Sequence, residues 1–263
     1  MIERDKPTAE LANQVDARIE HNGGWRLFMK VPSSHRCGAT EKTTSQLRKY
    51  PRTALAEAFL LAKIGNPIGA RDRLQALQSL VCGSTSDDAS LGADIVLVDT
   101  HIRVYEDRAL SEADSKRLTH LLLTLPADDL IGQALAFNHL STAALHRGEF
   151  DRAQDHAENA TRLYNLGEAQ FGSLHMHTHL GQIRMMRGDL TGAISEYDEM
   201  ESSLAELKGD PQGLKAICQA LKSEVAYEMN EMSAAQTLLD DAMARQLWAY
   251  SEEQTRDYLP QSL

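Results

Sequence analysis

The stretch that decides the fold runs from residue 133 to residue 206 and holds two similar phrases. Residues 133–153 read Gln-Ala-Leu-Ala-Phe-Asn-His-Leu-Ser-Thr-Ala-Ala-Leu-His-Arg-Gly-Glu-Phe-Asp-Arg-Ala, and residues 172–193 read Gly-Ser-Leu-His-Met-His-Thr-His-Leu-Gly-Gln-Ile-Arg-Met-Met-Arg-Gly-Asp-Leu-Thr-Gly-Ala. Each phrase ends in Arg-Gly, an acidic residue, an apolar residue, two further residues and Ala. Gly148 and Gly188 lie 40 residues apart, as do Ala153 and Ala193. Self-similarity at a fixed spacing indicates a repeat architecture.

Matching turn positions recur on both sides of this stretch. They are Gly65, about Asp107, Gly148, Gly188 and Asn230. Their spacings are about 42, 41, 40 and 42 residues. Glycine and asparagine are the residues that best tolerate a left-handed helix end. We therefore predict an all-α fold of about five helical hairpins with a period of ~41 residues.

Residues 94–105 have two interpretations. The run Ile95-Val96-Leu97-Val98 favours a strand by propensity. Apolar residues from Leu91 to Tyr105 nevertheless keep a helical period, and a lone strand would have no partner. We predict a helix here, followed by a second helix that Ser111 caps.

The period exceeds the ~34 residues of a tetratricopeptide repeat and lies nearer that of armadillo and HEAT repeats. The helix seams, however, follow the tetratricopeptide pattern of small residues. In the pair around Gly148, Ser141 and Ala144 would pack against Ala153 and Ala157, and such small side chains let two helices approach closely. We predict a right-handed superhelix of tetratricopeptide-like hairpins with lengthened helices.

Three parts follow from this interpretation. Residues 1–50 form a helical lead-in and a loop, and the loop spans residues 31–44. Residues 51–246 hold the repeats. Residues 247–263 are amphipathic but have no partner in the sequence, so we expect a tail or a capping helix.

Composition narrows the class of function. A net charge of −11 argues against a nucleic-acid-binding surface, which needs a basic face. The three cysteines, Cys37, Cys82 and Cys218, lack the spacing of a metal site or a disulfide framework, which favours a reducing compartment. No run approaches the ~18 apolar residues of a membrane helix, and the N-terminus lacks the features of a signal peptide. We expect a cytoplasmic protein that binds small molecules or other proteins.

Five phrases stand in order along the chain. They are Gly23-Gly24-Trp25-Arg26, Tyr50-Pro51-Arg52, Asn138-His139-Leu140, His179-Leu180-Gly181 and Glu224-Val225-Ala226-Tyr227-Glu228-Met229-Asn230-Glu231. Together they resemble the helical-repeat region of MalT-type, large ATP-binding LuxR-family transcription regulators, over roughly residues 18–247. The resemblance implies signal reception. In such regulators this superhelix lies between a nucleotide-switch module and a helix-turn-helix, and it binds the inducer or partner proteins.

The chain departs from the whole family pattern in two places. It holds no Gly-x-x-x-x-Gly-Lys-Ser/Thr phosphate loop, and no basic recognition helix follows residue 246. We therefore expect that this chain alone neither hydrolyses ATP nor binds DNA. It is either an excised sensor domain or a stand-alone relative.

A repeat superhelix offers a concave surface lined by the first helix of each hairpin. Counted from the turns, polar and aromatic positions on these helices would bind a sugar-like metabolite or a peptide, although each can also be a solvated helix position. They are Arg52, Phe59, Lys63, Asn138, Thr142, His146, His175, Thr178, Gln182, Glu224 and Tyr227.

His175 and His179 are i, i+4 neighbours on one helix face, which raises a zinc hypothesis. Zinc needs third and fourth ligands, and none is adjacent in the sequence, although His139 or His146 of the neighbouring hairpin could approach. We favour groove histidines at 175 and 179 and packing histidines at 139 and 177, with no metal and no cofactor.

No catalytic constellation emerges from the sequence. A Gly-x-Ser-x-Gly elbow that would present a nucleophile is missing, and Cys218 lies on an apolar stripe. The sequence favours a non-enzymatic sensor domain that binds a small-molecule effector, or a protein or peptide partner, in its groove. A stand-alone protein-interaction scaffold is the alternative, and a helical enzyme is the least favoured hypothesis. Self-association is compatible with either of the first two.

Overall fold

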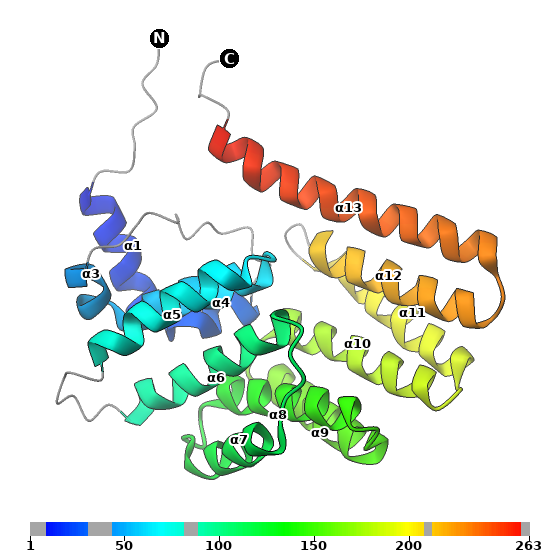
Figure 1. The fold of residues 1–263 in the computed structure, drawn as a ribbon, viewed down its shortest axis with the longest axis horizontal. Helices are drawn as coiled ribbons and strands as arrows, with labels where there is room; N and C mark the ends of the chain where they lie inside the picture. The colour runs from blue at the N-terminus through cyan, green and yellow to red at the C-terminus, as the bar shows by residue number, and fades with distance from the viewer. Residues whose placement is uncertain (1–8, 31–43, 82–88, 208–211, 259–263) are drawn as a thin grey trace. The chain divides into compact units, whose positions relative to one another are not determined.

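A computed structural model describes residues 9–30, 44–81, 89–207 and 212–258. In these residues every regular element is a helix, which confirms the all-α fold class (Figure 1). The expected loop at residues 31–44 lies, apart from Thr44, outside the described residues. The elements are α1 (Ala9–His21), η1 (Gly24–Arg26), α2 (Leu27–Lys30), α3 (Thr44–Lys49), α4 (Pro51–Lys63), α5 (Pro67–Val81), α6 (Ala89–Tyr105), α7 (Glu112–Thr124), α8 (Leu130–His146), α9 (Phe150–Leu166), α10 (Gln170–Met186), α11 (Leu190–Glu206), α12 (Gln212–Glu228) and α13 (Met232–Tyr258).

The expected turn positions are confirmed. Each of the five residues has a positive φ and lies between two consecutive helices: Gly65 (82°), Asp107 (56°), Gly148 (71°), Gly188 (81°) and Asn230 (62°). The backbone closes in the same way at these turns. For example, the amide of the following residue donates to a carbonyl five residues earlier, from Glu149 to Ala144 and from Asp189 to Arg184, both at 2.9 Å. This pattern is the Schellman motif, which satisfies carbonyls that the helix end leaves free.

The segment with two interpretations is helix α6, as predicted. Its apolar residues Leu97, Val98 and Ile102 are fully buried, so tertiary packing outweighs the strand propensity of the Ile-Val-Leu-Val run. Helix α7 begins after Ser111, whose hydroxyl accepts from the Asp114 amide while the Asp114 carboxylate accepts from the Ser111 amide. This capping box confirms the predicted cap.

Two compact units make up the chain. One spans Asn13–Met176, and the other joins Met1–Ala12 to His177–Leu263, so the division falls inside α10. The domain boundaries expected at residues 50 and 246 stay a prediction.

In the unit Asn13–Met176, the first helices of successive pairs lie side by side, since α4 contacts α6 and α6 contacts α8. The second helices pack against them over small residues. Ser141 of α8 donates its hydroxyl to the Ala153 carbonyl of α9 at 2.9 Å, and Ala153 and Ala157 are fully buried. This seam has the composition that the sequence predicts.

The Gly-Trp-Arg turn of η1 fixes the start of this unit. The Trp25 indole donates to Asp94 of α6 at 3.2 Å, and Arg26 lies 2.7 Å from the same carboxylate. Arg26 also donates two hydrogen bonds, of 2.7 and 2.5 Å, to Asp129 at the start of α8. Because Asp94 is only 1% exposed, Arg26 compensates a buried charge, which ties η1 to two helices.

In the unit that contains His177–Leu263, α10 and α11 are closely packed. A Cβ atom added to Gly181 would lie 2.2 Å from the Tyr197 ring, so only glycine allows this approach. Tyr197 is fully buried, and its carbonyl accepts from the Cys218 thiol of α12 at 3.4 Å. Burial raises the pKa of Cys218 to about 11, as expected for a packing cysteine.

Candidate functional site

Seven side chains form a cluster on α4, α6, α8 and the first part of α10, within the unit Asn13–Met176. We call it the histidine–lysine cluster, and its members are Phe59, Lys63, His101, Tyr105, His139, Phe171 and His175. Ring contacts connect its centre. The centroid of His101 lies 4.0 Å from that of Phe59 in a stacked arrangement, 4.8 Å from Tyr105 and 5.7 Å from His139.

Lys63 is the unusual member of the cluster. Its ammonium nitrogen lies 4.0 Å from the ring centroid of Phe171 and 5.7 Å from that of Phe59, and it donates to the Phe28 carbonyl at 3.4 Å. It forms no ion pair with any residue that the structure describes. Burial without a counter-ion lowers the pKa of Lys63 to about 7. The group therefore changes charge near neutral pH.

The three imidazoles are neutral at pH 7. Burial lowers the pKa of His139 to about 3 and that of His175 to about 4, and Lys63 adds to the shift at His175. Burial, His139 and Lys63 together hold the pKa of His101 well below its ordinary value. Each neutral ring offers one donor and one acceptor. The Nε2 atom of His101, a residue 7% exposed, is buried without a hydrogen-bond partner in the described part of the chain.

This chemistry suits binding better than catalysis. The cluster combines aromatic faces, a lysine without an ion pair in the described residues, and neutral imidazoles. Among the described residues, no carboxylate is a cause of the lowered pKa of Lys63, His101 or His175. An anionic group would supply the missing charge and accept a hydrogen bond from the unpartnered Nε2 atom of His101.

The expected ligand-binding residues divide between this cluster and other places. Phe59, Lys63 and His175 come together in it, and Phe59 is fully buried there. Arg52 instead joins the ion network around η1, at 3.8 Å from both Glu20 and Asp94.

On α8, Asn138 and Thr142 are buried, and the Thr142 hydroxyl donates to the Asn138 carbonyl at 3.2 Å. His146 lies exposed at the end of that helix. Four further expected residues belong to the other compact unit: Thr178 is buried, Gln182 is half-buried, and Glu224 and Tyr227 are exposed. The structure thus joins three of the eleven expected residues in one cluster.

The sequence already held a signal for two of the missed members, His101 and Tyr105. The position six residues before each turn is Phe59 in the first pair and His101 in the second. The position two residues before the turn is Lys63 in the first pair and Tyr105 in the second. The expected set took no residue from the second pair. Phe171 has no comparable signal.

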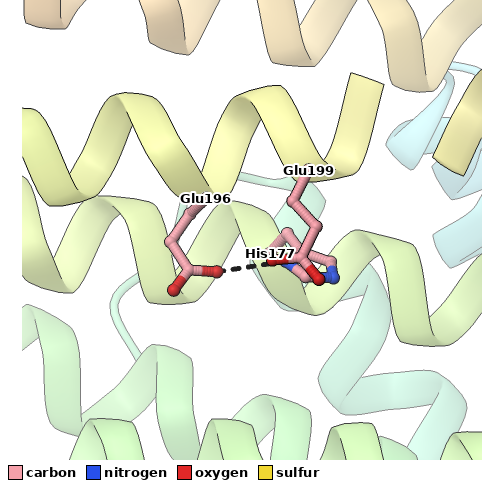
Figure 2. A group of neighbouring side chains, drawn as sticks. All are labelled: His177, Glu196 and Glu199. Atoms are coloured by element: carbon pink, nitrogen blue, oxygen red, sulfur yellow. Dashed lines mark hydrogen bonds and ion pairs between the residues drawn. The ribbon is translucent and has the colours of Figure 1, made fainter. Parts of the chain in front are cut away.

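His139 was expected to be a packing histidine, and it is 2% exposed. The zinc hypothesis around His175 and His179 finds no support, because these residues form no group of three metal-ligating side chains in the described residues. One such group does occur there. It consists of His177 of α10 with Glu196 and Glu199 of α11, and Figure 2 shows both glutamate side chains reaching from α11 to the imidazole.

The His177 Nδ1 atom lies 3.1 Å from the Glu196 Oε2 atom. Arg184 donates to the other Glu196 oxygen at 3.1 Å and also lies 3.2 Å from Asp189. His177 therefore lies in the α10–α11 seam, as expected, and also makes a polar contact with Glu196 across it.

No family model, curated protein or solved structure matches this chain. Among the described residues, no helix has both the length and the apolar character that crossing a bilayer requires. The resemblance to MalT-type regulators therefore stays a prediction, and the side-chain geometry carries the functional argument.

Proposed function

We propose that this chain is a non-enzymatic receptor domain that binds a small anionic metabolite at the histidine–lysine cluster. The observation that carries the proposal is the placement of Lys63. Its ammonium group lies over the rings of Phe171 and Phe59 and forms no ion pair with a described residue, an arrangement that is costly to maintain in a folded protein and that lowers its pKa. Perturbed ionisable groups of this kind gather at functional sites.

A carboxylate or phosphate on the ligand would pair with Lys63 and restore its ordinary charged state. The Nε2 atom of His101, which has no hydrogen-bond partner in the described residues, would donate to the same anion. The imidazole of His175 lies within electrostatic range of Lys63, and Phe171 offers an aromatic face to the rest of the ligand. Ligand binding is then coupled to proton uptake by Lys63, because the anion favours the ammonium form.

The architecture that supports this proposal is a right-handed superhelix of about five tetratricopeptide-like hairpins. Five helix pairs with equivalent left-handed turns support it, because such a superhelix is built from repeated helix pairs. The cluster draws on the first helices of four consecutive pairs, which are the helices that line the concave surface of a solenoid. The resemblance to MalT-type regulators adds a role in cytoplasmic signal reception for transcription control, in which the cluster receives the inducer.

The side chains of the cluster favour a receptor over an enzyme. Burial raises the pKa of Tyr105 to about 12, so its hydroxyl stays protonated. His139 and His175, with pKa values of about 3 and 4, are poor general bases at neutral pH. The cluster contains no serine or cysteine that an imidazole could activate.

A thermal-shift screen tests the proposal. Dicarboxylates, sugar phosphates and matched neutral sugars would be compared at pH 6.5 and pH 8.5, and each hit measured by calorimetry. A ligand at about 100 times its Kd should stabilise the fold by ~2.7 kcal/mol. We expect anionic hits, with tighter binding at pH 6.5, and loss of that binding in the Lys63→Met and His175→Ala variants.

Two exposed residues of α7 provide matched controls, because they have the same chemistry outside the cluster. Lys116→Met and His120→Ala should leave the affinity unchanged. If only neutral sugars bind, or if Lys63→Met binds an anionic hit as tightly as the wild type, the anion-receptor proposal is wrong.

The alternative is a protein-interaction scaffold, and one observation favours it. Large apolar side chains lie exposed on the last helix pair: Ile217, Tyr227, Met229, Met232, Leu239 and Met243. A partner that binds wild-type protein but not the Leu239→Glu variant, together with an empty metabolite screen, would favour the scaffold. A nucleotide-switch module and a helix-turn-helix encoded around this chain would favour the sensor.

A further inference from the structure

The group of His177, Glu196 and Glu199 is held on two rigid elements. His177 lies on α10, whereas Glu196 and Glu199 are i, i+3 neighbours and therefore share one face of α11. The close packing of Gly181 against Tyr197 sets the short distance between the two helices. Side chains as short as histidine and glutamate can therefore meet across the seam, as Figure 2 shows.

The distances nearly match those of a metal site. One ligand atom from each of the three residues lies within 4.8 Å of the other two. In a tetrahedral zinc site with bonds of ~2.0–2.2 Å, neighbouring ligand atoms are separated by roughly 3.4 Å. The contact between His177 and Glu196 is already at 3.1 Å. The side chain of Glu199 is exposed, so it can change rotamer to bring its carboxylate closer to the other two ligand atoms.

The surrounding charges allow a cation to enter. Arg184 neutralises Glu196 at present, at 3.1 Å, but it also lies 3.2 Å from Asp189. When a metal binds Glu196, Arg184 can keep its ion pair with Asp189 and withdraw from the site. The two glutamates would then compensate the two charges of the metal, so that binding leaves no uncompensated charge in the seam.

We propose that His177, Glu196 and Glu199 form a binding site for one divalent transition-metal ion, with Zn²⁺ as the preferred ion and water as the fourth ligand. One imidazole nitrogen with two carboxylate oxygens is a donor set that suits zinc, whereas calcium and magnesium prefer oxygen ligands alone. The site clamps α10 to α11 and is independent of the proposed metabolite site.

Calorimetric titration of the metal-free full chain with Zn²⁺ tests the site, and a parallel titration with Co²⁺ reports coordination geometry through its visible absorption. We expect one equivalent of Zn²⁺ to bind, a Co²⁺ spectrum of tetrahedral type, and a Tm that rises with Zn²⁺ concentration. The Glu199→Gln and His177→Ala variants should each lose Zn²⁺ affinity by at least ~10-fold. Loss of a residue that only orients a metal ligand already costs ~10-fold or more, so loss of a ligand itself should cost no less.

Glu199→Gln is the decisive variant, because the side chain of Glu199 is exposed and the substitution should leave the fold intact, which circular dichroism checks. His120→Ala and Glu112→Gln, both at exposed positions of α7, are the matched controls and should bind Zn²⁺ like the wild type. Equal Zn²⁺ affinity in the wild type and the folded Glu199→Gln variant would overturn the proposal. Loss of binding in His175→Ala instead would place the metal in the histidine–lysine cluster and overturn it too.

Discussion

Replacement of Lys63 by methionine should stabilise the fold near neutral pH while it abolishes the proposed binding of an anionic ligand. Methionine keeps the length and the apolar contacts of the lysine stem but removes the amino group, which the fold must otherwise bury. A residue that weakens the fold yet is needed for binding is the expected signature of a functional site.

The magnitude follows from the pKa of Lys63, which falls from 10.5 to about 7 in the folded state. At ~1.36 kcal/mol for each pKa unit, a fully buried lysine would lower the stability by about 4.8 kcal/mol. The Lys63 side chain is only half-buried, which reduces this cost, and the cation–π contact with Phe171 offsets a further ~0.5–1 kcal/mol. We therefore expect the free energy of unfolding to rise by ~1–2 kcal/mol in Lys63→Met at pH 6.5.

The gain should depend on pH in a defined direction. The folded state binds the Lys63 proton less tightly than the unfolded state does, so wild-type stability rises with pH between about 7 and 10.5. Below pH 7 the lysine is charged in both states and the penalty is complete. Above pH 10.5 it is neutral in both states and the penalty is absent. The stability difference between Lys63→Met and the wild type should therefore shrink steadily from pH 7 to pH 10.

Urea unfolding followed by Trp25 fluorescence measures this difference within the relevant unit. Trp25 is fully buried, 5.4 Å from Phe59, and a Trp248→Phe background removes the second tryptophan signal. Lys116→Met on α7 is the control, with an expected change of at most ~0.5 kcal/mol. A loss of stability by more than ~1 kcal/mol in Lys63→Met at pH 6.5 would refute the reasoning, because Lys63 would then be a structural residue.

Three further predictions concern the scaffold, and urea unfolding measures each of them. Arg26→Met removes the nearest cation of the Asp94 and Asp129 carboxylates and should cost ~3–5 kcal/mol, although Arg52 stays 3.8 Å from Asp94. Gly148→Ala should cost ~1–2 kcal/mol through its left-handed backbone alone, since an added Cβ meets no atom within 4 Å, whereas Gly92→Ala inside α6 should stabilise by ~0.5–1 kcal/mol. Gly181→Ala should cost ~1–3 kcal/mol because its Cβ would overlap the Tyr197 ring, and an unchanged stability would contradict the described seam.

The fold class could be predicted from the sequence because its signals are local. A glycine or asparagine at a helix end predicts a left-handed backbone there. The 40-residue spacing of Gly148 and Gly188 then predicts that the same helix pair recurs along the chain. Ser111 likewise caps α7 through residues only three positions away. Such features can be predicted without knowing which residues pack against them from distant parts of the chain.

The site could be predicted only in part, because its contacts join residues far apart in the chain. Lys63 and Phe171 are separated by more than 100 residues, and no local pattern says that the aromatic ring will cover the ammonium group. The same holds for Arg26 and Asp129, which the structure joins across 103 residues. Whether Arg52 faces a ligand or a buried carboxylate is decided by the docking of η1, which helical periodicity does not report.

The equivalent positions of the helix pairs differ in how strictly the backbone restricts their residue type, and the less restricted positions can carry binding specificity. Left-handed turns and alanine seams set the backbone of each helix pair, so those positions are restricted by geometry. The position six residues before the turn is not restricted in this way: it is Phe59 in the first pair, His101 in the second, Thr142 in the third and Gln182 in the fourth. In the proposed solenoid, similar backbones with different side chains at one position would provide a specific binding surface. At this position the first two pairs place a stacked aromatic ring and an imidazole beside Lys63, so the histidine–lysine cluster arises where the scaffold leaves the residue type open.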